Sequence, residues 1–188
     1  MNTGFVGIGS MGGMLVRALL RSRALTVENA WAANRSEGKL TALAAEFPGI
    51  HAASGRKLAA NCGLMFLCLK AGDTVSALAQ MDPELHPGQL LVTTASQIPL
   101  QALEDRVPCR VAKLIPSITQ EIGAGVTLLM YGPRATADDH KLLEDLMGPY
   151  QSSHRDRRVA VSASHRPDFR RSGVCGLPSE IDGGGSRT

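Results

Sequence analysis

The sequence predicts an α/β protein with a doubly wound, mostly parallel sheet, and two observations carry this prediction. Up to about residue 148, short apolar runs alternate with stretches of helical periodicity, as expected of repeated strand–helix units. Residues 64–69 are apolar throughout, which is typical of a parallel strand covered on both faces. We therefore expect one α/β domain over residues 1–148.

The predicted elements begin with a short apolar strand close to the N-terminus and a helical stretch over residues 14–21. Later strands are expected at residues 30–33, 50–53, 64–69, 90–94 and 110–115, with a further apolar run at 126–131. Later helices are expected at residues 37–47, 54–61, 73–81, 99–105 and 135–147. This alternation of strand and helix favours a mostly parallel sheet.

The first strand runs into a glycine-rich sequence, Gly7-x-Gly9-x-x-Gly12, and a predicted helix follows it. In the Rossmann dinucleotide-binding unit the first glycine makes a tight turn, the second lets the backbone approach a pyrophosphate, and the third lets the helix pack on the strand. The helix N-terminus adds free N–H groups and the positive end of its dipole. The spacing alone also occurs in turns that bind nothing, but the flanking strand and helix favour dinucleotide binding. The predicted pyrophosphate contacts are Gly7, Ile8, Gly9, Ser10, Met11 and Gly12.

The end of the second strand distinguishes between the two nicotinamide dinucleotides. An NAD site usually has Asp or Glu there, to accept from the ribose 2'-hydroxyl. This chain instead has Asn34, Arg35 and Ser36, with Lys39 about one helical turn later. A guanidinium group can bind phosphate through two hydrogen bonds and stack on adenine. These residues predict NADP (NADPH) as the cofactor; the alternative is a solvated helix start with Ser36 as its N-cap.

Composition argues against several classes of function. A net charge of +3 in 188 residues, without aromatic residues between the arginines, gives no reason to expect a nucleic-acid partner. The chain enters a core strand without a leader, and no apolar run is long enough to span a bilayer, so we expect a cytoplasmic protein. The four cysteines lack the spacing of a metal site. No catalytic triad or carboxylate pair stands out, and the catalytic residues remain unassigned.

Residues 149–188 differ in kind from the rest of the chain. From residue 151 onward there are seven arginines and no lysine, against eight arginines and five lysines before it. Ser, Gly, Arg and Pro dominate, and neither helical nor strand periodicity is visible. We interpret this segment as an irregular, disordered tail; a sharper hypothesis is an out-of-frame product in place of a lost domain.

Three stretches together resemble the N-terminal domain of the pyrroline-5-carboxylate reductase family: residues 5–12, 66–70 and 110–117. Residues 107–128 are closer still to the late-competence ComE-operon branch of that family, similar to ComE operon protein 4. The resemblance covers residues 1 to about 148. It implies a Rossmann cofactor domain, whereas the C-terminal helical domain, which in the family carries the substrate pocket, a catalytic Thr and the homodimer contact, is not recognisable here.

Family membership would imply NADPH-dependent reduction of a small-molecule imine, 1-pyrroline-5-carboxylate, to proline. By resemblance, Leu69 and Lys70 would line the cofactor, and Thr94, Ala95 and Ser96 would lie near the nicotinamide. Lys70 is also a candidate from position alone, because ligands of parallel sheets bind beyond the carboxyl ends of the strands. Pro116 and Ser117 are candidates on the substrate side.

Departures from the family pattern leave two other functions open. Ser117 stands where the reductases usually have Asn, which favours a non-catalytic, NADP-binding regulatory relative. The pattern of Asn34, Arg35, Ser36 and Lys39 also resembles that of reductases acting on other small substrates, such as a β-hydroxyacid.

Overall fold

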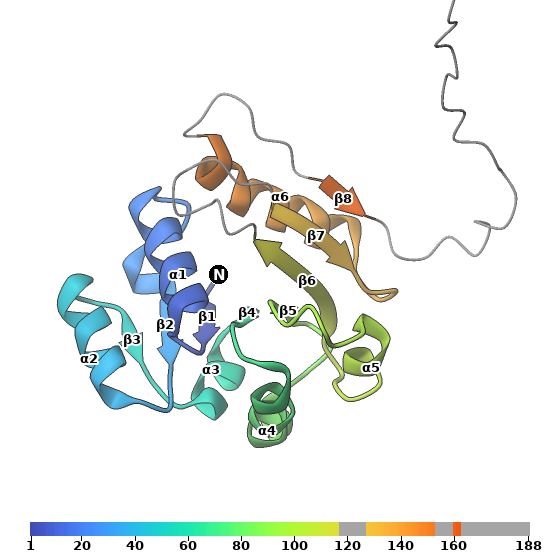
Figure 1. The fold of residues 1–188 in the computed structure, drawn as a ribbon, viewed down its shortest axis with the longest axis horizontal. Helices are drawn as coiled ribbons and strands as arrows, with labels where there is room; N and C mark the ends of the chain where they lie inside the picture. Colours follow the sequence, from blue (N-terminus) through green and yellow to red (C-terminus); the bar gives the residue numbers. More distant parts are fainter. Residues whose placement is uncertain (117–126, 153–159, 163–188) are drawn as a thin grey trace, which may run out of the picture.

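The computed structural model describes residues 1–116, 127–152 and 160–162. These residues form one eight-stranded sheet in the order β3-β2-β1-β4-β5-β6-β7-β8 (Figure 1). The first six positions follow the doubly wound order in which two mononucleotide-binding halves meet at β1 and β4. The strands are β1 (Thr3–Val6), β2 (Ala30–Ala33), β3 (His51–Ala52), β4 (Leu64–Leu67), β5 (Leu90–Thr93), β6 (Arg110–Pro116), β7 (Thr127–Tyr131) and β8 (Ala160–Ser162).

Every described strand pair is parallel except β6 with β7. In the centre of the sheet, β1 pairs in register with both β2 and β4, so that Phe5 lies beside Ala32 and Phe66. The rings of Phe5 and Phe66 stack with their centroids 5.3 Å apart. The predicted doubly wound, mostly parallel sheet is therefore confirmed.

Helices cover both faces of the sheet (Figure 1). One face packs against α1 (Ser10–Arg21), α2 (Glu37–Glu46) and α6 (Ala137–Ser152). The other face packs against α3 (Gly55–Asn61), α4 (Ala71–Met81) and α5 (Leu100–Glu104). Side chains of a strand alternate between the two faces, so Phe66 belongs to the first core and Met65 and Leu67 to the second. This double cover explains why residues 64–67 are continuously apolar.

The boundaries differ from the sequence-based expectation near the carboxyl ends of the central strands. Helix α1 begins at Ser10 rather than residue 14, and β4 ends at Leu67 rather than residue 69. The first turn of α1 contributes no large apolar side chain to the core, since burial of such side chains starts at Leu15. Apolar periodicity could not reveal a turn whose side chains do not face the core.

The carboxyl-terminal part also departs from expectation. Helix α6 continues to Ser152, beyond the predicted end at residue 147, and β8 (Ala160–Ser162) pairs with β7. Two pieces of regular structure thus lie within the segment predicted to be irregular. The rest of that segment, residues 153–159 and 163–188, lies outside the described residues.

Candidate functional site

The candidate site lies at the carboxyl ends of β1, β4 and β5, in the middle of the sheet. Strand β1 leads into the glycine loop, β4 into residues 68–70 and β5 into residues 94–99. Because β1 is flanked by β2 on one side and β4 on the other, the chain winds in opposite directions from this point. Open α/β sheets bind ligands in the crevice at such a switch point.

Two glycines of the loop are required by the protein's own packing. Gly7 has a φ of +94°, which residues other than glycine rarely adopt. A Cβ atom there would lie 2.6 Å from the Cys68 carbonyl oxygen. A Cβ atom at Gly12 would overlap the Gly7 carbonyl oxygen and lie 2.8 Å from the Cys68 Cβ. These contacts agree with the tight turn and the close helix packing predicted for the two residues.

Gly9 differs, because a Cβ atom there would meet no described atom within 4 Å. Gly9 is the N-cap residue of α1, no side chain caps this helix end, and its first turn holds no acidic residue. An uncapped helix N-terminus with open space before it suits an anionic group. The space beside Gly9 is therefore not filled by internal packing and is open to a ligand.

Asn34 connects the glycine loop to the end of β2. Its Oδ1 atom accepts a hydrogen bond from the Ile8 backbone N–H (2.9 Å), and its Nδ2 atom donates to the Ser36 carbonyl (3.1 Å). The sequence suggested only a ligand-binding role for Asn34. In the structure, its amide also holds the loop against the β2–α2 turn.

The other polar residues after β2 are exposed: Arg35, Ser36 and Lys39. Ser36 occupies the N-cap position of α2, but its side chain makes no capping hydrogen bond. Neither Arg35 nor Lys39 forms an ion pair with any residue the structure describes. Two cationic side chains thus stand at the end of β2 without an internal partner in that part of the chain.

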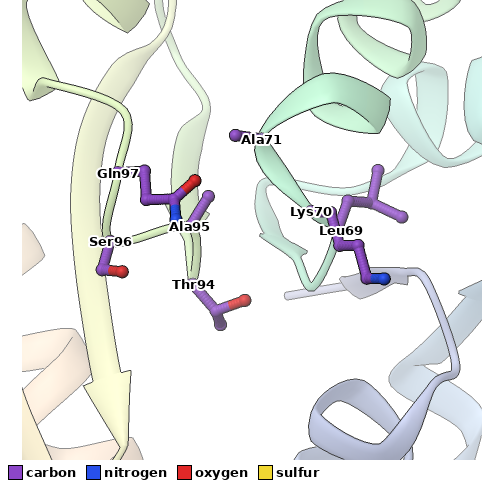
Figure 2. A pocket seen from close by; sticks show the side chains of 7 residues that line it. All are labelled: Leu69, Lys70, Ala71, Thr94, Ala95, Ser96 and Gln97. Carbon is purple, nitrogen blue, oxygen red and sulfur yellow. The ribbon is translucent and has the colours of Figure 1, made fainter.

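A cavity of about 380 Å³ lies between the segments that follow β4 and β5 (Figure 2). Figure 2 shows Leu69 and Lys70 on one side of it, opposite Thr94, Ser96 and Gln97. The structure thereby brings together five residues predicted to contact the cofactor. The cavity lining is Leu69, Lys70, Ala71, Thr94, Ala95, Ser96 and Gln97.

Hydrogen bonds hold the wall that follows β5. The Thr93 hydroxyl accepts from the Ala95 N–H (3.1 Å), and the Thr94 N–H donates to the Leu67 carbonyl (3.1 Å). The buried Lys113 of β6 donates to two carbonyls of this wall, those of Ser96 and Ile98. Sequence reasoning did not select Lys113 or Gln97 as site residues, because nothing in the order of residues shows that the Lys113 side chain reaches residues 96 and 98 or that Gln97 lines a cavity.

Cys68 lies between the glycine loop and the cavity. Burial raises the pKa of its thiol to about 12, and a hydrogen bond with Thr94 offsets this only in part. The group is therefore a thiol near neutral pH, and we assign it no nucleophilic role.

The predicted substrate-side residues contribute little to this description. Pro116 ends β6, its side chain is not among those described, and Ser117 lies outside the described residues.

Within residues 1–116, 127–152 and 160–162, no group of three or more His, Cys, Asp or Glu side chains could hold a metal ion. No helix in these ranges is both long and apolar enough to cross a membrane.

Comparison with known sequences gives matches over most of the chain. Residues 2–97 match the family described as NADP oxidoreductase coenzyme F420-dependent. ComE operon protein 4 of Bacillus subtilis (strain 168) is 32% identical over 165 residues, covering 85% of this chain and 60% of the relative. Pyrroline-5-carboxylate reductase 3 of the same organism is 26% identical over 148 residues, covering 78% and 54%. The chain thus spans between 54% and 60% of the length of these two relatives.

Solved structures share the fold. A pyrroline-5-carboxylate reductase from Coxiella burnetii superposes with a TM-score of 0.74 at 20% identity, covering 89% of this chain and 60% of that structure. The NADP-bound pyrroline carboxylate reductase of Plasmodium falciparum gives a TM-score of 0.70 at 18% identity, covering 87% and 57%.

Proposed function

This chain belongs to the family of NADP oxidoreductases described as coenzyme F420-dependent, and we propose that its Rossmann domain binds NADPH for the reduction of a small imine. The predicted resemblance to the pyrroline-5-carboxylate reductases is confirmed. NADP as the cofactor agrees with the family. Binding by this chain, the imine substrate and the reduction itself are our proposals.

One combination of observations carries the proposal. The uncapped N-terminus of α1 opens beside Gly9, and the exposed Arg35 and Lys39 stand at the end of β2. No carboxylate is present at residues 34–36 to favour the ribose hydroxyl of NAD. A pyrophosphate site beside a cationic site matches the two anionic parts of NADPH.

In this proposal, different residues of the chain bind different parts of the cofactor. The glycine loop would bind the pyrophosphate, and Arg35, Ser36 and Lys39 the adenosine 2'-phosphate. Leu69, Lys70 and residues 94–96 would enclose the nicotinamide end, since a cavity of about 380 Å³ fits part of a dinucleotide and lies near the lower end of ligand pockets, roughly 300–1,000 Å³. When bound, NADPH supplies the hydride for an imine carbon.

Fluorescence titration tests the cofactor. The chain has one tryptophan, Trp31 in β2, whose emission can be transferred to a bound reduced nicotinamide. We expect NADPH to bind more tightly than NADH, and Arg35→Ala to weaken NADPH binding about tenfold while weakening NADH binding much less. Arg106→Ala is the matched control, because Arg106 is also exposed but precedes the amino end of β6, at the opposite end of the parallel strands from the candidate site. Equal affinities for the two nucleotides would contradict the assignment.

Turnover tests the reaction. The chain is mixed with NADPH and 1-pyrroline-5-carboxylate, and NADPH oxidation is compared with the proline formed. Equal amounts would support imine reduction, whereas NADPH oxidation with a β-oxo acid, which would be reduced to a β-hydroxyacid, or with oxidised coenzyme F420 would assign a different acceptor.

A second candidate, an NADP-binding regulatory protein, is favoured by Ser117, which stands where the reductases usually have Asn. Tight NADPH binding without turnover of any of these substrates would support it.

A further inference from the structure

Lys113 is a buried lysine in the middle of β6, with only 5% of its surface exposed. Its Nζ atom donates to the carbonyl oxygens of Ser96 (3.1 Å) and Ile98 (2.6 Å). It forms no ion pair with any acidic side chain in the described ranges. In the strand register Lys113 lies opposite Thr93, the residue from which the cavity wall continues.

A lysine in this position is costly for the fold. Moving an ammonium group out of water without a charged partner is unfavourable, and burial accordingly lowers the pKa of Lys113. Hydrogen bonds to the two carbonyls favour the charged form and offset part of this effect. The neighbouring strand positions Val111 and Ala112 are filled by apolar side chains. An apolar side chain could therefore fill position 113 as far as packing is concerned, and the ammonium group needs another explanation.

The two carbonyls belong to the segment 94–99, which joins β5 to α5; residues 94–97 of it line the cavity, and Ile98 follows them directly. Within the segment, the Ile98 N–H donates to the Ala95 carbonyl over 3.4 Å, a long hydrogen bond. Lys113 ties the same segment to the next strand through two donors, one of them short. Removing these donors would leave two carbonyls of the wall without their partner.

The charge itself lies close to the cavity. Nζ is 3.1 Å from the carbonyl oxygen of Ser96, and Ser96 lines the cavity. The nicotinamide ring is neutral in NADPH and positively charged in NADP⁺. A positive charge behind the wall, in surroundings less polar than water, disfavours a second positive charge nearby.

We propose that Lys113 is a positioning residue that acts through residues 94–98: it holds this wall for the nicotinamide end, and its charge favours NADPH over NADP⁺. The inference rests on the proposed function, because it assumes that the nicotinamide end enters this cavity. Lys113 lies outside the residues predicted to contact the cofactor, and its charge would give the site a preference for the reduced form of the cofactor.

The test compares the wild-type chain with Lys113→Met and Lys113→Arg, and uses Lys141→Met as the control. Met has nearly the length of Lys without its charge, Arg keeps the charge, and Lys141 is exposed on α6. Dissociation constants for NADPH and NADP⁺ are measured for each. We expect the NADP⁺-to-NADPH ratio of dissociation constants to fall about threefold to tenfold in Lys113→Met and to be retained in Lys113→Arg and Lys141→Met.

Hydrogen exchange provides the second readout, and it needs no ligand. We expect the amides of Ala95 and Ile98 to exchange faster in Lys113→Met, while peptides from α1 stay unchanged. If the role of Lys113 were purely structural, Lys113→Met would alter the exchange but would weaken the binding of NADPH and NADP⁺ equally. An unchanged ratio, or unchanged exchange in residues 94–98, would overturn the proposal.

Two further outcomes are informative. If Lys113→Met does not fold, Lys113→Arg decides the question, because a ratio altered despite the retained charge would overturn the role of that charge. If the wild-type chain binds neither nucleotide, the proposed function fails, and hydrogen exchange still decides whether Lys113 holds the segment.

Discussion

The two halves of the candidate site are built in different ways. The first half, the glycine loop with the end of β2, is shaped by the backbone: Gly7 and Gly12 allow a close approach that a Cβ atom would prevent. The second half, the wall formed by residues 94–98, is held by side chains of strands, the Thr93 hydroxyl and the Lys113 ammonium. The first half therefore depends on the absence of a Cβ atom at Gly7 and Gly12. The second half depends on side-chain hydrogen bonds, including those from Lys113 on the neighbouring strand β6.

This difference determines how each half can be recognised and damaged. A glycine loop carries its requirements within six consecutive residues, so that its spacing is visible in a sequence. The wall depends on Lys113, which lies 17 residues from Ser96, and the resemblance of residues 110–117 to the family does not indicate that Lys113 contacts Ser96. Substitutions in the first half should thus act through backbone clashes, and those in the second through lost hydrogen bonds and charge.

The largest effect is expected at Gly12. In Gly12→Ala the new Cβ atom would overlap the Gly7 carbonyl oxygen, which outweighs the helix propensity of alanine, about 1 kcal/mol. We expect a loss of at least about 3 kcal/mol in the free energy of unfolding, measured by urea denaturation.

The control for Gly12→Ala is Gly9→Ala. Gly9 has a φ of −81° and open space around it, so its substitution should cost less than about 1 kcal/mol of stability yet weaken NADPH binding about tenfold or more. If the two variants were equally stable, the distinction between a packing glycine and a ligand-facing glycine would be wrong.

A smaller effect is expected at Asn34. Its side chain holds the glycine loop by hydrogen bonds, so it tests whether the first half also depends on a side chain. Asn34→Ala would leave the N–H of the buried Ile8 without its acceptor and should cost about 1–3 kcal/mol. Asn34→Asp keeps an acceptor for that N–H, so it should retain more stability while shifting the nucleotide preference from NADPH toward NADH. Thermal unfolding and paired titrations measure both effects; an alanine variant as stable as the wild type would contradict the anchoring role.

The smallest effect is expected at Glu46, which joins α2 to α1 outside both halves of the site. Its carboxylate contacts Arg17 (2.6 Å) and Arg21 (2.7 Å) on the surface. The hydrogen bond from Arg17 is the main cause that lowers the pKa of Glu46 from 4.5. Since exposed ion pairs contribute little, Glu46→Gln should change the melting temperature only slightly near neutral pH and leave NADPH binding unchanged.

The pH dependence of that small difference follows from its sign. A carboxyl group with a lowered pKa in the folded state stabilises the fold above its unfolded pKa, and this contribution disappears as the pH falls through the folded pKa. The wild type and Glu46→Gln should therefore converge below about pH 4.5. Melting temperatures at several pH values test this, and a difference that grows in acid would contradict it.

Much of the fold could be predicted from the sequence, because its evidence is local. The second strand was predicted at residues 30–33 and is β2 (Ala30–Ala33), since four small or apolar residues precede the polar sequence at its end. The family was predicted from residues 5–12, 66–70 and 110–117, and this prediction is confirmed. The individual contacts to NADPH stay predictions, although the cavity brings five of those residues together.

Other features could not be predicted, for physical reasons. The first turn of α1 has no apolar periodicity because its side chains do not pack into the core, and β8 is too short to leave a pattern. The internal hydrogen bonds of Asn34 depend on where the glycine loop lies in space, which no spacing of residues encodes.

The sequence by itself determined the alternation of strands and helices, the glycine loop and the cationic residues after β2, because each rests on residues that are neighbours in the chain. Only the tertiary structure decided that the segments after β4 and β5 enclose a cavity, and that the ammonium group of Lys113 reaches the wall of that cavity. These contacts arise when parallel strands far apart in sequence are placed side by side, and the direction of a buried side chain depends on that packing rather than on local sequence.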